Sequence, residues 1–173
     1  MSTTYFTWAF PADPKDVPAD VSALEDAEDL LTHVSERCLL MSASRNNWLL
    51  SNLQALSAMH GLRHLPRLGS TLSVVPVADI PDVIGEIESL LTVAREAPQF
   101  VASALQSRWE ATDVSAALAA SKEAETPHLG PSGAEEGDSP EYLFAWLKSL
   151  RALLGHAQKS RLCVVHVQPR WQM

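Results

Sequence analysis

The sequence predicts an α+β fold, mostly helical, in which about five helices pack on a small sheet that includes the N-terminal and C-terminal strands. Both ends of the chain are rich in aromatic and β-branched residues, while the long middle repeats apolar residues every three or four positions. The chain has 173 residues, 46% of them hydrophobic, which is enough to bury one core. We therefore expect a single α+β domain over residues 1–173, with a flexible loop at about 122–139, where the periodicity is lost.

Three segments have the residue pattern of β-strands. In residues 4–10 aromatic and β-branched side chains alternate, and Pro11 then removes the next backbone donor. Residues 161–168 are apolar on both faces, so we expect the C-terminal strand to be central and to pair with the N-terminal one. Residues 71–77 are also apolar and β-branched, but Pro76 within them predicts an edge strand or one that ends early.

The first helix is expected to have one apolar and one acidic face. Ser22 and Glu25 match a capping box at its start. Apolar residues then recur in steps of three and four as far as Met41, which places one stripe toward the core. A polar break at residues 42–47 is expected to end this helix.

Further helices follow between recognisable start and stop signals. Asn47 is placed to cap the second helix and Gly61 to end it in a left-handed conformation. Asp79 is expected to cap the third, and Pro98 either ends that helix or opens the next segment. Ser139, followed by proline, begins the final helix. The apolar stripes of the third and final helices are Ile80, Ile84, Ile87, Leu91 and Ala94, and Leu143, Trp146, Leu147, Leu150, Leu153, Leu154 and Ala157.

Candidate reactive side chains occur singly or in unsuitable spacings. His60 and His64 have the i, i+4 spacing of two metal ligands on one helical face, but Gly61 interrupts the helix and a third ligand motif is missing, which favours polar surface. Cys38 and Cys163 lie on apolar stripes, which favours reduced, buried thiols over a single bridge. The sequence has no glycine-rich phosphate loop. We therefore expect no catalytic residue, no cofactor and no metal.

One histidine supports an alternative hypothesis. His166 lies between two valines in the C-terminal strand, where a nearby carboxylate would let it act as a general base. The alternative is a small α+β enzyme or ligand-binding domain with a pocket near His166, lined by Trp8, Trp146 or Arg161. A hydrogen-bonded strand residue is the simpler interpretation of the same histidine.

The net charge of −8 is unevenly distributed along the chain. Residues 13–36 carry eight acids against one lysine, which gives −7. A chain this acidic is poorly suited to nucleic acid, whose phosphates require a basic face, and better suited to a protein with a basic surface. The polar side of the first helix presents Glu25, Asp26, Asp29 and Glu36, which we predict as a partner-binding face. A solvated face whose acids suit the helix dipole is the alternative.

These features favour a non-enzymatic protein-binding protein, most concretely an immunity protein or inhibitor that neutralises a partner toxin or effector through an acidic surface. A structural subunit of a larger assembly is a third possibility. The N-terminal residues lack the pattern of a signal peptide, and no apolar run approaches the ~18 residues of a membrane span. We therefore expect a cytoplasmic protein that does not bind a membrane, and the sequence leaves the oligomeric state open.

Overall fold

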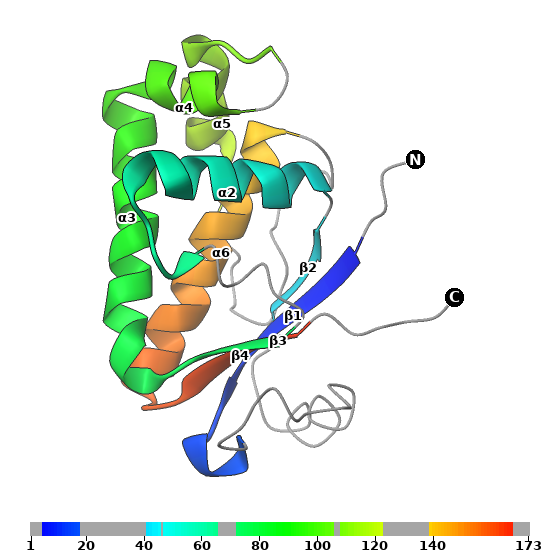
Figure 1. Ribbon diagram of the computed structural model, residues 1–173, viewed down its shortest axis with the longest axis vertical. Coiled ribbons are helices and arrows are strands. Elements are labelled where there is room, and N and C mark those ends of the chain that lie inside the picture. Colours follow the sequence, from blue (N-terminus) through cyan, green and yellow to red (C-terminus); the bar gives the residue numbers. More distant parts are fainter. Residues whose placement is uncertain are drawn as a thin grey trace.

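The computed structural model describes residues 5–17, 41–45, 47–65, 72–105, 108–122 and 139–167. Within these ranges five α-helices pack on an antiparallel sheet of four strands, which confirms the α+β prediction (Figure 1). The strands are β1 (Tyr5–Ala12), β2 (Met41–Arg45), β3 (Leu72–Val75) and β4 (Cys163–Val167); the helices are α2 (Asn47–His60), α3 (Ile80–Glu96), α4 (Pro98–Ala104), α5 (Ala111–Ala120) and α6 (Pro140–Lys159), with 3-10 turns η1 (Pro14–Asp16) and η4 (Val77–Asp79).

The sheet has the order β2-β1-β4-β3, so the two terminal strands are its interior pair. This confirms that the C-terminal strand is central and pairs with the N-terminal one, for example through Phe10 opposite Val165. Cys163, Val164 and Val165 are all buried. Because consecutive strand residues point to opposite faces, both faces of β4 are shielded from solvent at these positions.

The two edge strands differ in how well the sequence predicted them. β3 ends directly before Pro76 and pairs only with β4 among the described strands, as the proline predicted. The polar break expected at residues 42–47 is wrong, because Met41–Arg45 forms β2 and pairs with β1. Small serine and alanine side chains give this segment no strand pattern of its own, and the backbone partners offered by β1 decide its conformation. The rest of the expected first helix lies outside the described residues.

Helix α6 is the centre of the core. Its start matches the prediction, since the Ser139 hydroxyl accepts a hydrogen bond from the backbone N–H of Tyr142 at 3.2 Å and proline occupies the first helical position. All seven residues predicted to face inward on this helix are buried. α6 runs beside α3 and also contacts β1, β2 and β4, so it joins the helices to the sheet (Figure 1).

The segment after Pro98 contains two helices with a break between them. Pro98 begins α4, which was one of the two outcomes predicted for this proline. The separate helix α5 was not predicted. α4 ends where Leu105 becomes extended, with φ −73° and ψ 139°. α5 begins after Glu110, whose backbone N–H donates to the Asp113 carboxylate at 2.9 Å. This local hydrogen bond starts a new helix where the apolar pattern alone indicates a continuous one.

The loop expected at about residues 122–139 falls almost entirely outside the described residues, so its flexibility stays a prediction.

Candidate functional site

The site begins where α2 stops. Gly61 adopts a left-handed conformation with φ 65°, as predicted, and the backbone N–H of Leu62 donates to the carbonyl of Ser57 at 2.8 Å. The chain therefore leaves the helix axis after His60, and His64 lies in the following loop. His60 and His64 consequently do not share one helical face. No group of three or more His, Cys, Asp or Glu side chains able to hold a metal occurs in the part of the chain that the structure describes.

Glu86 of α3 fixes this loop in place. Its carboxylate accepts hydrogen bonds from the consecutive backbone N–H groups of Arg63, His64 and Leu65. The His64 N–H lies 2.9 and 3.0 Å from the two carboxylate oxygens, and the Leu65 N–H lies 2.8 Å from one of them. Successive amides of this kind form a concave anion-binding nest, and here the anion belongs to the protein itself.

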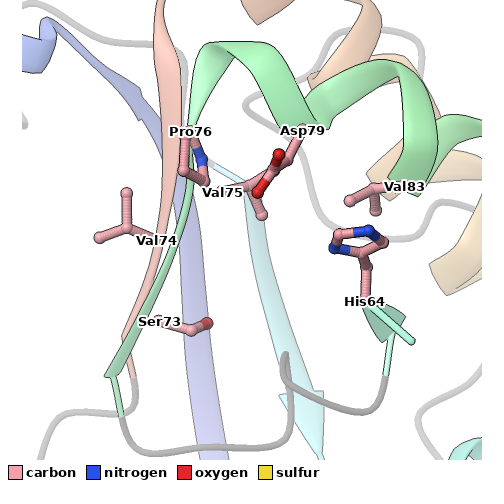
Figure 2. Close-up of a pocket in the computed structure, with 7 residues that line it drawn as sticks. All are labelled: His64, Ser73, Val74, Val75, Pro76, Asp79 and Val83. Carbon is pink, nitrogen blue, oxygen red and sulfur yellow. The ribbon is translucent and has the colours of Figure 1, made fainter.

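The loop held by Glu86 forms one wall of a small hollow next to β3, which we name the β3 hollow (Figure 2). The hollow is lined by His64, Ser73, Val74, Val75, Pro76, Asp79 and Val83. Its volume of about 30 Å³ has room for water or a similarly small group. Pockets for metabolites and drug-sized ligands are roughly ten times larger or more, so this hollow does not enclose a substrate of that size.

Two oxygen-bearing side chains, Asp79 and Ser73, line the β3 hollow. Asp79 occupies the N-cap position of α3, as predicted, but its side chain makes no capping hydrogen bond. The Ser73 hydroxyl oxygen is buried and has no hydrogen-bond partner among the described residues. Figure 2 shows the Asp79 carboxylate, the His64 ring and the Ser73 hydroxyl on the same side of β3. The hollow therefore has on one side an Asp79 carboxylate that does not cap α3 and a Ser73 hydroxyl without a partner among the described residues.

A second carboxylate lies at the rim. The Asp82 carboxylate is 4.0 Å from Nε2 of His64, and the two side chains are 71% and 24% exposed respectively. Such an exposed pair contributes little to stability. It does place a further negative charge beside the β3 hollow.

Cys163 is a buried structural thiol. Its Sγ donates to the carbonyl of Ala12 at 3.1 Å, which ties β4 to β1 through a side chain. Burial raises the pKa of the Cys163 thiol above its ordinary value of 9.0, with a smaller contribution in the same direction from Asp13. Because the thiolate is the reactive form, this environment disfavours nucleophilic chemistry, as the sequence predicted. Cys38 lies outside the described residues.

The residues named for a pocket near His166 do not line the β3 hollow. The backbone of His166 lies in β4, opposite Ala9 and Ser73, and its side chain is outside what the structure describes. Trp146 is buried in the core on α6, and Arg161 is exposed in a left-handed turn after that helix. Ser73 is thus the described neighbour of His166 that reaches the hollow.

The predicted partner-binding residues Glu25, Asp26, Asp29 and Glu36 all lie outside the described residues, so their role stays a prediction. The sequence did not single out Ser73 or Glu86. A serine before two valines and one acid among several on α3 carry no distinguishing pattern.

No protein-family model, curated protein or solved structure matches this chain. None of the helices in the described ranges is long and apolar enough to cross a membrane.

Proposed function

We propose that this protein acts without catalysis, by binding another protein and blocking it. In this proposal it is an immunity protein or inhibitor that neutralises a partner toxin or effector in the cytoplasm. The observation that carries the proposal is the segregation of charge: residues 13–36 carry eight acids against one lysine, a net −7, within 24 positions. A concentrated negative surface attracts a basic partner, speeds encounter and selects against acidic competitors.

The described surface adds support. The acids Asp82 and Glu88 of α3 are exposed, so negative charge also lies outside residues 13–36. The β3 hollow has a volume of about 30 Å³, which suits recognition of a side-chain end better than turnover of a metabolite. The alternative, an enzyme or ligand-binding domain with a pocket near His166, stays a prediction, since the His166 side chain lies outside what the structure describes.

Charge reversal tests the proposed acidic face. The tagged full chain is first used to isolate the partner, and the product of the neighbouring gene is the first candidate. The Kd of the complex between the chain and this partner is then measured at several salt concentrations. Asp29→Lys should weaken binding about tenfold or more at low salt and flatten the salt dependence, because an interfacial carboxylate contributes both affinity and steering.

The matched control is Glu96→Lys, which makes the same charge change on an exposed residue in the last turn of α3. It should leave the Kd nearly unchanged. If the two reversals weaken binding equally, the partner responds to the net charge of the chain and not to the acidic face. If neither reversal changes the Kd, surface charge does not contribute to binding.

A further inference from the structure

The sheet has a second apolar face, which points away from the helices. We propose that residues 18–40 of this chain cover that face with the apolar stripe of their predicted helix. The proposal concerns how the chain packs on itself, so it does not require the protein partner of the proposed function. It determines, however, on which side of the molecule the predicted partner-binding acids lie.

The two faces of the sheet are separated by the alternation of side chains along β4. Val164 packs in the core that the helices form. Cys163 and Val165 point to the opposite side, because consecutive strand residues face opposite ways. The register places Ala12 opposite Cys163 and Val74 opposite Val165, so these residues share that side. We name the side that carries Ala12, Val74, Cys163 and Val165 the outer face.

The outer face is buried although the helices pack on the other side of the sheet. Ala12 and Val165 are 0% exposed and Cys163 is 3% exposed, and none of the three belongs to the helical core among the described residues. Neighbouring strands shield the flanks of such a side chain but not its end, so full burial requires a second layer. The structure contains one chain, so this layer belongs to the chain itself and not to a partner.

The sequence distinguishes the two longest segments that lie outside the described residues, 18–40 and 123–138. Residues 18–40 carry apolar side chains in steps of three and four, which is the pattern of a helix with one face buried. Residues 123–138 have no such period, and Leu129 is their only large apolar residue. An apolar face is therefore matched by the first segment and not by the second.

The connections of the chain also favour residues 18–40. This segment begins after η1, which follows β1, and ends at β2, whose first residue, Met41, pairs with Ala9 of β1. Both of its ends are therefore attached to the sheet. Residues 123–138 instead join α5 to α6 within the helical layer.

The length of the apolar stripe suits the width of the sheet. From Leu24 to Cys38 a helix extends about 21 Å at 1.5 Å per residue. Four strands spaced about 4.8 Å apart span roughly 14 Å between the axes of the two edge strands. One helix in this segment can therefore cross the whole outer face.

The same helix would turn its acids to solvent. At about 100° per residue, the mean directions of the apolar stripe and of the four predicted acids lie roughly 180° apart. The stripe consists of Leu24, Ala27, Leu31, Val34 and Cys38, and the acids are Glu25, Asp26, Asp29 and Glu36. The acidic face then lies on the sheet side of the molecule, opposite α3 and α6.

Site-specific photo-crosslinking of the full chain tests which segment covers the outer face. The photoreactive residue p-benzoylphenylalanine replaces Leu31 in one variant and Asp29 in the matched control, and mass spectrometry identifies the linked peptides after irradiation. Leu31 should link to the peptides that contain β3 and β4, and Asp29 should not. Absence of that link, or an equal link from Asp29, would overturn the proposal, as would a link to these strands from the same probe at Leu129.

The accessibility of Cys163 provides a second measurement that does not depend on the probe. Cys38→Ala leaves Cys163 as the single thiol, and its modification by an aromatic disulfide reagent is followed in native buffer. Leu31→Asp should raise the modification rate at least tenfold above that of Leu118→Asp, which places the same charge on a partly buried residue of the helical layer. Each rate is divided by the unfolded fraction from urea titration. Equal values would mean that Cys163 reacts through global unfolding and would contradict a cover formed by the stripe.

These results are separable from the proposed function. If Leu31 links to the sheet and Asp29→Lys leaves partner binding unchanged, the packing is supported and the inhibitor proposal loses its acidic face. If Leu31 does not link to the sheet and Asp29→Lys weakens partner binding, the packing is overturned and the inhibitor proposal stands.

Discussion

Glu86 provides the sharpest test of how this fold is held together. Its carboxylate joins α3 to the loop after α2 by accepting from the backbone N–H groups of Arg63, His64 and Leu65. Substitution by alanine removes every one of these acceptors at once and leaves the exposed His64–Asp82 pair as the remaining polar contact described between the loop and α3. The loop also forms a wall of the β3 hollow, so the same change should loosen that site.

The expected loss of stability follows from the exposure of the three amides. A hydrogen bond to a charged group contributes roughly 1.5–3 kcal/mol when it is shielded from water. The bond from Arg63 is exposed, so water replaces it at little cost, whereas those from His64 and Leu65 are partly buried. Glu86→Ala should therefore lower the free energy of unfolding by about 2–3 kcal/mol, or the Tm by roughly 4–12 °C for a chain of this size. Glu86→Gln keeps one acceptor oxygen and should lose about half as much.

Glu88→Ala is the matched control two residues along the same helix. Its carboxylate is 3.0 Å from Nη1 of Arg151 in an exposed ion pair, which should contribute no more than about 0.5 kcal/mol. Urea and thermal unfolding of both variants measure the difference. If Glu86→Ala loses no more stability than Glu88→Ala, the amide nest does not hold the loop.

Four further substitutions probe other described features. Gly61→Ala should cost about 1 kcal/mol because its φ of 65° strains any residue with a Cβ, whereas Gly85→Ala, in open space on α3, should gain about 0.5–1 kcal/mol, and urea titration compares the two. Lys148→Met should cost about 1–3 kcal/mol by thermal unfolding, because its ammonium donates to the carbonyls of Leu118 and Ser121 at 2.9 and 2.8 Å and so caps α5. Burial raises the pKa of Cys163, so its contribution to stability is complete below the thiol's ordinary value of 9.0 and is lost as the pH rises above it. The wild type should therefore lose stability relative to Cys163→Ala between pH 8 and 10 in urea unfolding, and parallel pH profiles would contradict this.

The parts of the fold that the sequence predicted are those where local pattern and tertiary packing agree. The interior strand β4 carries apolar residues on both faces because both faces are covered at Cys163, Val164 and Val165, so its composition indicated its central position. α6 shows a serine cap, a proline and a continuous apolar stripe, and each of these signals requires only its own neighbours in sequence.

The parts that the sequence did not predict depend on a distant partner. β2 has small serine and alanine residues between Met41 and Arg45 and becomes a strand through backbone pairing with β1, a contact that no local pattern encodes. α5 separates from α4 through the hydrogen bond between Glu110 and Asp113, and the apolar residues on either side of the break do not report it.

The candidate site shows why acids are especially hard to interpret from sequence. Asp79 was predicted as a helix cap, which fixes its position, yet its carboxylate faces the β3 hollow instead of its own helix. Glu86 resembles any other acid on α3, and what distinguishes it is a loop that turns at Gly61 and presents three amides to it. The role of a carboxylate is thus set by the donors that approach within about 3 Å, and these belong to a different segment of the chain. The same reasoning applies to Glu25, Asp26, Asp29 and Glu36. Their spacing predicts that they share the polar face of a helix, but it does not distinguish a face that binds a partner from one that contacts only solvent. Only the comparison of Asp29→Lys with a charge-matched reversal elsewhere separates those two roles.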